Sequence, residues 1–344
     1  MNIGFFLRHF TERGTEVAAY DYAHYNETIL GNKSIIICFT PEKQQSLEWP
    51  MTRASYDKFK ARFPIVEIND ISEMRNVISQ YNLGFFYTLT HGSRDIYEFE
   101  NKQIWGSCNT IKHCVFDTTC PEGDFYISIG DCLNNRIHTN IPVIPHIIQL
   151  PECNENLRSE LQIPSDAVVL GRHGGSTQFN IPFTHEAIKE FLELNMNVYF
   201  LLMNTDKFYE HPKIIYLDVT TDMISKVKFI NTCDAMIHSR LMGEIFSLSI
   251  GEFSIKNKPI ITCPNGDMNQ DHLYILGDKA ILYNSKDELV NIFKNIQAII
   301  KSRDDWNAYR KYTPEYVVKL FNDMIFSKKL SQPKNFRLSF LVKI

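Results

Sequence analysis

Two carboxylates with seven residues between them, Glu244 and Glu252, are the first feature of this sequence that could do chemistry. They lie between one apolar run and the next, Pro259–Cys263, a pattern that predicts a strand, a loop, a short helix and a strand. The loop also holds His238, Ser239 and Arg240. In an α/β protein such a loop lies at the carboxyl edge of the sheet, where ligands bind. The alternative is an ordinary strand–helix–strand unit with scattered surface charge.

A second loop, Arg172–Thr177, follows another predicted strand and contains two adjacent glycines. Glycine lets the backbone approach a ligand closely, and an arginine can pair with phosphate oxygens in a forked geometry. The loop has neither the Walker A nor the G-x-G-x-x-G pattern, and it could also be a glycine-rich turn with a surface arginine. Together with a helix that begins near Ser247, it predicts a diphosphate site, because the free N–H groups of a helix N-terminus favour an anion.

The residue types suggest separate roles within this predicted site. Arg172 would hold one end of the diphosphate, and the N–H groups around Phe246–Leu248 would hold the other. Because like charges repel, the carboxylates would not bind phosphate. Glu252 suits the hydroxyls of a ribose, and Glu244 suits the hydroxyls of a sugar beyond the diphosphate. Each glutamate could instead be an ordinary solvated acid.

Apolar runs alternate with helical patterns along the whole chain, which predicts an α/β protein with parallel sheets. The expected strands are Asn2–Leu7, Ser34–Phe39, Ile65–Ile68, Gly84–Leu89, Thr110–Phe116, Phe125–Ile129, Ala167–Gly171, Asn197–Met203, Ile214–Leu217, Ala235–Ile237, Pro259–Cys263 and Ile281–Tyr283. The expected helices include one from Thr15 and Ile71–Tyr81, Phe183–Leu194 (with Thr184 as N-cap), Ser225–Thr232, Lys286–Lys301 and Pro314–Phe326. A stiff, proline-containing connector, Ile141–Glu152, divides domain 1–150 from domain 151–312. We expect residues 313–344 to form a helix and tail that pack back on the first domain.

Composition excludes several classes of function. The 344 residues suit two domains, and a formal net charge of -4 argues against a dedicated nucleic-acid binder. None of the eight cysteines forms a C-x-x-C pair, so neither a zinc ribbon nor a thioredoxin-like site is indicated. The first residues do not resemble a signal peptide and no apolar run reaches membrane-spanning length, which favours the cytoplasm. The basic tail 327–344 could touch an anionic membrane surface, or it could be solvated or pack on its own domain.

The stretch around the two glutamates resembles the E-x7-E signature of retaining GT-B glycosyltransferases, particularly those of glycosyltransferase family 4 ("glycosyl transferases group 1"). The family pattern E-G-F-G-L-P-x-x-E, followed by K-P-V-I, compares here with Glu244-Ile-Phe-Ser-Leu-Ser-Ile-Gly-Glu252, followed by Lys258-Pro-Ile-Ile. The usual glycines and proline are replaced by Ile245, Ser247 and Ser249. The resemblance extends to Val143–Ile148, to Gly171-Arg172 and to the turn Arg13–Glu16, and so spans the chain.

This resemblance implies a GT-B fold, in which two Rossmann-like β/α/β domains face each other across a cleft. It implies transfer of a sugar from a nucleoside-diphosphate-sugar donor to a hydroxyl of a glycan or lipid-linked acceptor, with retained anomeric configuration and no metal or other cofactor. The donor-binding residues would be Gly14, Arg172, His173, Gly174, His238, Arg240, Phe246, Ser247, Leu248 and Glu252. The residues with catalytic roles would be Arg172, Arg240, Glu244 and Asp117. Thr177 stands where the family has a lysine, so Arg240 and His173 would meet the phosphate charge.

The first domain would carry the acceptor site. His91 and Asp117 are at predicted strand ends facing the cleft, and Tyr22 and His24 lie in a polar and aromatic run of the kind that sugars favour. A polar residue at a strand end is often only a loop hydrogen-bonding group, and the aromatic run could be the buried face of a helix. Two other functions stay open: a nucleotide-sugar 2-epimerase, which needs additional acid/base carboxylates and no acceptor, and a catalytically inactive binding protein that kept the fold.

Overall fold

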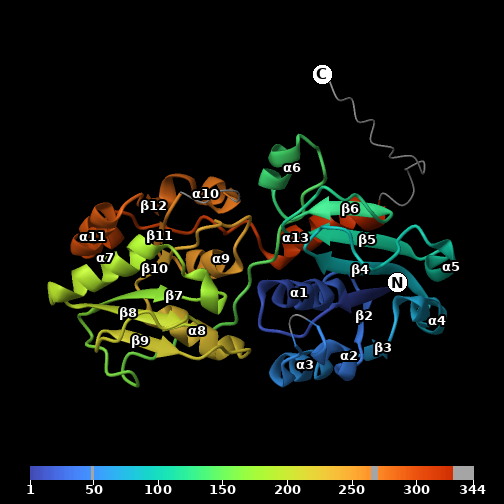
Figure 1. Ribbon diagram of the computed structural model, residues 1–344, viewed down its shortest axis with the longest axis horizontal. Coiled ribbons are helices and arrows are strands. Elements are labelled where there is room, and N and C mark those ends of the chain that lie inside the picture. The colour runs from blue at the N-terminus through green and yellow to red at the C-terminus, as the bar shows by residue number, and fades with distance from the viewer. Residues whose placement is uncertain (48–49, 265–269, 328–344) are drawn as a thin grey trace.

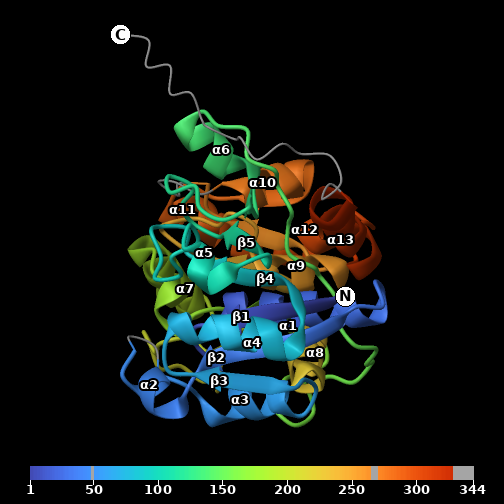
Figure 2. The same ribbon diagram turned by 90° about the vertical axis from the view of Figure 1, so that its right-hand side faces the viewer.

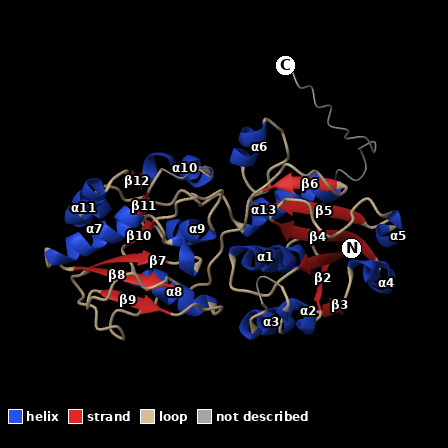
Figure 3. Ribbon diagram, in the orientation of Figure 1, coloured by secondary structure: helices blue, strands red, loops and turns tan. Residues whose placement is uncertain are grey.

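The computed structural model describes residues 1–47, 50–264 and 270–327 of the chain. It has two domains side by side, each built on a parallel six-stranded sheet flanked by helices (Figure 1, Figure 3). This is the pair of Rossmann-like α/β domains that the alternation of apolar runs and helical patterns predicts.

The first sheet has the strand order β3-β2-β1-β4-β5-β6. Its strands are β1 Asn2–Leu7, β2 Lys33–Phe39, β3 Ile65–Ile68, β4 Leu83–Thr90, β5 Asn109–Cys114 and β6 Phe125–Ser128. Its helices are α1 Gly14–Thr28, α2 Pro41–Gln45, α3 Arg53–Lys60, the 3₁₀ turn η1 Ile71–Glu73, α4 Met74–Tyr81, α5 Lys102–Trp105 and α6 Asp131–Ile137. The strand order reverses between β1 and β4, so the loop after β1 opens where open α/β sheets bind ligands.

The second sheet has the order β12-β11-β10-β7-β8-β9. Its strands are β7 Val168–Arg172, β8 Val198–Met203, β9 Ile214–Leu217, β10 Ala235–His238, β11 Ile260–Thr262 and β12 Ala280–Leu282. The remaining elements are η2 Ser176–Gln178, α7 Pro182–Glu193, α8 Met223–Thr232, α9 Leu248–Ile255, α10 Asp271–Leu276, η3 Gly277–Lys279, α11 Lys286–Lys294, α12 Ile296–Lys301, α13 Pro314–Phe321 and the π-helical turn η4 Asn322–Phe326. Since β7 and β10 are neighbours at the reversal point, the two loops singled out from the sequence meet there.

In the central strands β1 and β7, neighbouring side chains belong to different hydrophobic cores. In β1, Phe5 packs into one core while Phe6 packs into another on the opposite face of the sheet. In β7, Val169 and Leu170 divide in the same way. This two-sided burial follows from the period-two geometry of a strand, and it explains why the strands read as continuous apolar runs.

Three details of the predicted helices are wrong. The helix expected over Lys286–Lys301 is two helices, α11 and α12, which meet at Asn295. The helix expected from Ile71 begins as the 3₁₀ turn η1. Thr184 does not cap α7, because the helix begins at Pro182, a residue whose fixed φ suits a first turn. The Thr184 hydroxyl is instead buried and hydrogen-bonded with Ser239 and Tyr283.

The middle of the connector between the domains, Ile144–Ile148, is buried. The N–H of Ile144 donates to Ser128 O at 2.8 Å, which ties the start of the connector to β6. Ile147 and Ile148 are buried in a core that takes residues from both domains. The N–H of Ile148 donates to Tyr312 O at 2.8 Å, so the connector lies against the returning C-terminal segment.

The C-terminal helix α13 packs on the first domain although it follows the second in sequence (Figure 1; Figure 2 shows it from the side). The ring of Phe321 lies 5.3 Å from that of Tyr22, and the ring of Phe326 lies 4.8 Å from that of Phe85. Within the described ranges, no helix is long and apolar enough to cross a membrane. The basic segment proposed to touch a membrane falls almost entirely in 328–344, outside the described residues.

Gly92 permits the close approach of two loops at the carboxyl edge of the first sheet. Its φ is +110°, and an added Cβ would overlap the carbonyl of Asp117. We expect Gly92→Ala to lower the free energy of unfolding by about 3 kcal/mol, because strain and a backbone clash add. Gly31→Ala is the matched control: its φ is +66° but nothing lies within 4 Å, so it should cost about 1 kcal/mol. Equal losses for both variants in urea unfolding would contradict the clash.

Candidate active site

A cleft of about 600 Å³ lies between the domains. Its first-domain wall is the loop after β1 with the start of α1 and part of α3. Its second-domain wall is formed by the loops after β7, β8 and β10, the start of α9 and part of α8. The carboxyl edges of both sheets therefore open into one space, which is where a ligand site is expected in such a fold.

Most of the predicted donor site reaches this cleft. The predicted residues that line it are Gly14, Arg172, His173, Gly174, His238, Arg240, Glu244, Phe246, Ser247, Leu248 and Glu252. Thr177, which stands in place of the family's lysine, lines it as well. The fold thus brings together segments that are far apart in the sequence, as the sequence analysis requires.

Arg172 is buried and holds the donor-side loops together. Its guanidinium donates to Asn204 O and Thr205 Oγ1 at 2.7 Å each, and to Gly175 O at 2.6 Å. Burial lowers its pKa to about 10, so the side chain stays charged at neutral pH. Because three N–H groups already have partners, only the remaining donors of Arg172 are available to a phosphate.

Arg240 and Glu244 form a largely buried ion pair on the cleft wall. Arg240 Nη1 lies 2.8 Å from Glu244 Oε2, and their side chains are 11% and 16% exposed. Nε2 of His238 lies 3.6 Å from the other carboxylate oxygen. Burial by itself would raise the pKa of Glu244, but the adjacent His238 and the charge of Arg240 outweigh it and lower that pKa to about 2. Glu244 is therefore ionised at neutral pH.

Hydrogen bonds among His272, Thr262, His238 and the backbone of Glu244 hold the loop that carries Glu244 in place. His272 Nδ1 lies 3.0 Å from Glu244 O, and His272 Nε2 lies 3.4 Å from Thr262 Oγ1. The same hydroxyl lies 2.9 Å from His238 Nδ1. Burial lowers the pKa of His272 to about 4, so its ring is neutral at physiological pH. His272 thus holds the backbone of Glu244, while His238, which also lines the cleft, lies beside its carboxylate.

Helix α9 begins at Leu248 with Ser247 as its N-cap, which confirms the helix start predicted near Ser247. Ser247 has φ of +63°, in the left-handed region, at a position where the family pattern has glycine. Its Oγ accepts from Ile250 N at 3.4 Å. A Cβ on Gly14 would lie 3.5 Å from Leu248 Cδ1, so the N-termini of α1 and α9 approach each other across the cleft.

The departure from the family pattern at Ile245 is accommodated by packing. A Cβ on Gly130 would lie 2.5 Å from Ile245 Cγ2, so the glycine leaves room for the isoleucine. The ring of Phe246 packs against Tyr309 and Tyr312, and the Tyr309 hydroxyl donates to Phe246 O at 2.6 Å. The Phe246 side chain is therefore mainly a core residue.

Glu252 is buried between two basic side chains. Its oxygens lie 2.9 Å from Lys226 Nζ and 2.9 Å from His173 Nε2. Burial would raise the pKa of Glu252, but the charge of Lys226 and the contact with His173 outweigh it and lower the pKa to about 2. Lys226 in α8 and Lys58 in α3 both line the cleft, and neither is predicted from the sequence. Thr177 stands in this cleft where the family has a lysine, and the charge of Lys226 is already paired with Glu252.

Glu16, in the first turn of α1, is a further carboxylate on the cleft wall. Burial raises its pKa to about 7, and the hydrogen bond from the Thr15 hydroxyl only partly opposes this shift. A group with such a pKa can exchange a proton near neutrality. The sequence placed Glu16 in the turn after the first strand, but it gave no reason to expect a perturbed pKa.

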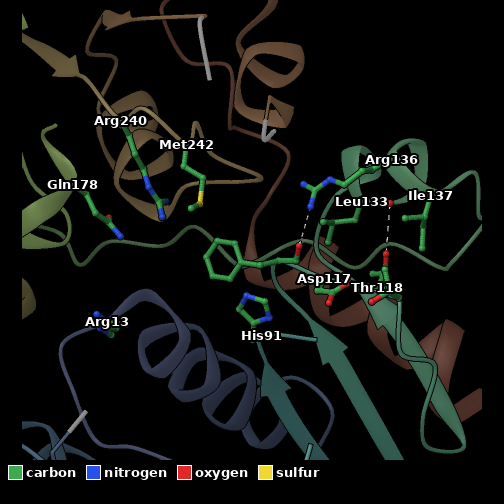
Figure 4. A pocket seen from close by; sticks show the side chains of 12 residues that line it. Arg13, His91, Asp117, Thr118, Leu133, Arg136, Ile137, Gln178, Arg240 and Met242 are labelled. Atoms are coloured by element: carbon green, nitrogen blue, oxygen red, sulfur yellow. Dashed lines mark hydrogen bonds between the residues drawn. The ribbon is translucent and has the colours of Figure 1, made fainter. Parts of the chain in front are cut away.

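A smaller pocket of about 530 Å³ adjoins the cleft and contains His91 and Asp117 (Figure 4). The N–H groups of Phe116 and Asp117 both donate to His91 O at 2.9 Å, which places the two predicted residues together. Asp117 Oδ1 accepts from Thr119 N at 2.8 Å, so this carboxylate also has the loop-stabilising role considered as its alternative. Arg13, Phe116, Gln178 and Arg240 line both spaces.

Tyr22 and His24 line neither space. Tyr22 is buried, and its hydroxyl donates to Pro145 O at 2.8 Å. His24 Nδ1 accepts from Arg62 Nε at 3.3 Å. Tyr22 therefore belongs to the buried face of α1, the alternative considered from the sequence, and neither residue reaches the cleft or the adjoining pocket.

No family model and no curated protein matches this sequence. Solved structures do resemble it. HepE from Anabaena, in complex with UDP-glucose, superposes with a TM-score of 0.71 over 96% of this chain and 99% of HepE, at 13% identity. A glycosyltransferase from Rickettsia africae gives 0.65 over 95% and 98%, at 14% identity. A putative UDP-N-acetylglucosamine 2-epimerase from Listeria monocytogenes gives 0.62 over 97% and 98%, at 10% identity.

This chain has the GT-B fold. The alignments cover nearly its whole length, and its two parallel sheets are the two Rossmann-like domains of that fold. Across the described parts of this GT-B protein, no group of three or more His, Cys, Asp or Glu side chains is arranged to hold a metal ion.

The raised pKa of Glu16 predicts how the free energy of unfolding depends on pH. The folded protein keeps a proton on Glu16 up to about pH 7, whereas the unfolded chain releases it near 4.5. Stability therefore falls as pH rises through this window, by about 3 kcal/mol for this group. Urea unfolding should show that the wild-type protein loses free energy of unfolding between pH 5 and pH 8. Glu16→Gln should lose less, because the contribution of Glu16 is absent. Parallel losses in the two proteins would contradict the shift.

Proposed function

We propose that this protein is a glycosyltransferase that moves a sugar from a nucleoside-diphosphate donor to a hydroxyl of a glycan or lipid-linked acceptor. One observation carries the proposal: Arg172, Arg240 and the N-terminus of α9 converge on a single cleft whose wall also contains both glutamates of the E-x7-E pattern. The similar structures support it, since HepE binds UDP-glucose in its crystal and the Rickettsia protein is named a glycosyltransferase.

The diphosphate would lie between Arg240 and the first N–H groups of α9, where positive charge and free donors coincide. Arg172 would shape the adjoining loop and offer its remaining N–H groups. Glu252 would accept from the ribose hydroxyls, with Lys226 and His173 keeping it ionised. Glu244 would accept from hydroxyls of the transferred sugar, while its pairing with Arg240 fixes the position of both side chains.

In the transfer step, the acceptor oxygen forms a bond to the anomeric carbon as the bond from that carbon to the diphosphate oxygen breaks. The electron pair leaves with the diphosphate, which also takes the acceptor proton. We propose that attack occurs on the face from which the diphosphate leaves, which retains the anomeric configuration. Arg240 and the α9 N-terminus would stabilise the negative charge that develops on the diphosphate, without a metal ion.

A panel of UDP-, GDP-, ADP- and dTDP-sugars, incubated with the purified full-length chain, tests the proposal. Release of nucleoside diphosphate from at least one donor is expected, and it should persist in EDTA. NMR of the product's anomeric proton would show whether configuration is retained. If no member of the panel binds or reacts, the assignment as a nucleotide-sugar enzyme is wrong.

Arg240 should contribute mainly to turnover. Arg240→Ala removes a cation that stabilises the leaving diphosphate, so kcat should fall by about 100-fold. The control is Arg75→Ala: Arg75 is an exposed arginine on α4 that donates to Gln103 O and lies outside both pockets. Thermal unfolding of both variants would show whether loss of the ion pair to Glu244 has unfolded the protein. A folded Arg240→Ala enzyme with normal kcat would remove Arg240 from the mechanism.

Glu252 should contribute mainly to nucleotide affinity. Glu252→Ala removes the acceptor for ribose hydroxyls, and calorimetry should show binding of the nucleoside diphosphate weakened by about tenfold. Glu190→Ala is a matched control, because Glu190 also pairs with a lysine, Lys286 at 2.6 Å, but lies outside the cleft. Unchanged affinity in Glu252→Ala would disprove the ribose assignment.

A second candidate is a nucleotide-sugar 2-epimerase, and Glu16 is the observation that favours it. That reaction needs an acid/base group beside the sugar, and Glu16 has a pKa of about 7 on the cleft wall. The Listeria protein with a similar structure is named a putative 2-epimerase. Inversion at C2 of the donor sugar without added acceptor would support this candidate, whereas acceptor-dependent release of the nucleotide supports the transferase.

A further inference from the structure

The wall of the cleft contains a buried histidine that the proposed mechanism does not use. His146 belongs to the connector and lines the cleft, and its side chain is only 5% exposed. Its Nδ1 is buried and has no hydrogen-bond partner among the described residues. A buried polar atom without a partner costs free energy, and such atoms are uncommon in folded proteins. An inference from this nitrogen rests on the proposed transferase function.

Other buried polar atoms of the cleft that lack a hydrogen bond have a charged neighbour. His173 Nε2 and Glu252 Oε2 lie 2.9 Å from each other as an ion pair, and His238 Nε2 lies 3.6 Å from Glu244 Oε1. Within the described ranges, no ion pair includes His146. Burial lowers the pKa of His146 to about 4, so its ring is neutral at physiological pH. A neutral imidazole has one nitrogen that donates and one that accepts.

A neighbouring histidine, His113 in β5, is an example of a structural histidine in this fold. Its ring lies 6.4 Å from that of His146. His113 Nδ1 lies 2.9 Å from the Tyr87 hydroxyl, and its Nε2 lies 2.9 Å from Ile144 O. Both nitrogens of this buried ring thus have protein partners, whereas Nδ1 of His146 has none in the described part of the chain. A ligand in the cleft could supply the partner that His146 lacks.

Contacts on both sides hold His146 in place. The Tyr22 hydroxyl donates to Pro145 O at 2.8 Å, one residue before His146. The His146 ring packs against the ring of Phe246, with centroids 5.7 Å apart and planes at 88°. Because the backbone beside it and the ring itself are both held, the imidazole can fix a bound group in one position.

The position of His146 favours contact with the sugar of the donor. Phe246, which its ring touches, follows Glu244 by two residues, and Glu244 is the residue that we assign to hydroxyls of the transferred sugar. A phosphate oxygen only accepts hydrogen bonds and is better met by an arginine. A sugar hydroxyl both donates and accepts, so it can satisfy either nitrogen of a neutral imidazole.

We propose that His146 forms a hydrogen bond with a hydroxyl of the transferred sugar. The contact would hold the sugar between the connector and the loop that carries Glu244. It exists only when a sugar is attached to the nucleotide, so it would not contribute to binding of the nucleoside diphosphate alone. The unpaired nitrogen would destabilise the free protein and favour the complex with the sugar nucleotide.

Thermal unfolding of two variants separates this role from a structural one. His146→Leu removes an unpaired polar atom, so the melting temperature should stay close to that of the wild type or rise. His113→Leu is the matched control, because it leaves the Tyr87 hydroxyl and Ile144 O without their partner. It should lower the melting temperature by about 5 °C or more. Equal losses in the two variants would show that His146 is structural and would overturn the proposal.

Calorimetry with the full-length chain tests the contact itself. The probes are UDP-glucose, GDP-mannose, ADP-glucose and dTDP-glucose, each measured beside its nucleoside diphosphate. For the sugar nucleotide that the wild type binds, His146→Leu should weaken affinity by about tenfold. Affinity for the matching nucleoside diphosphate should change by less than about twofold, because that ligand lacks the hydroxyl. His146→Asn keeps a donor and an acceptor and should restore most of the lost affinity.

The proposal is overturned if His146→Leu binds the sugar nucleotide as tightly as the wild type, or if it loses the same affinity for the nucleoside diphosphate. It is also overturned if His146→Asn loses as much affinity as His146→Leu. A wild-type protein that binds none of the nucleoside diphosphates would instead count against the proposed donor function, so the two failures are distinguishable.

Discussion

Two buried carboxylates and their cations are the constraint on which the cleft depends. Glu244 is paired with Arg240 at 2.8 Å and Glu252 with Lys226 at 2.9 Å, and all four side chains are largely out of water. An unpaired charge in such a place is strongly destabilising, so each pair fixes its loop and helix in one arrangement. Because Arg240 also faces the adjoining pocket, the same pairing joins the donor and acceptor sides of the proposed reaction.

The chain crosses between the two domains twice, and the two crossing segments hold the walls of the cleft in place. The connector follows α6 and is hydrogen-bonded to β6 through Ile144 and Ser128, and the segment before α13 returns to lie against it through Ile148 and Tyr312. The carboxylate of Asp271 in α10 accepts from Cys132 N in α6, which adds a direct hydrogen bond between the domains. These contacts place the carboxyl edges of two separate sheets opposite each other, so that residues from both can act on one ligand.

The departures from the family pattern make sense only in three dimensions. Serine occupies a left-handed position at 247 and compensates by capping α9, and Ile245 fits because residue 130 is a glycine. Thr177 stands where the family has a lysine, and residues outside this loop contribute to the charge of the cleft. Lys226 and Lys58 line the same cleft from helices of different domains, and Lys226 is already paired with Glu252.

The sequence by itself determined the alternation of strands and helices, the two domains, the connector and the start of α9, because these depend on local periodicity and on the stiffness of proline. It also identified the loops after β7 and β10, since polar residues after buried strands share one sheet edge. Only the tertiary structure decided which charges meet. Contacts between distant segments place Lys226 beside Glu252, raise the pKa of Glu16, bury Tyr22 and gather the arginines around the second pocket. Burial and Coulomb interactions are set by those contacts and not by spacing along the chain.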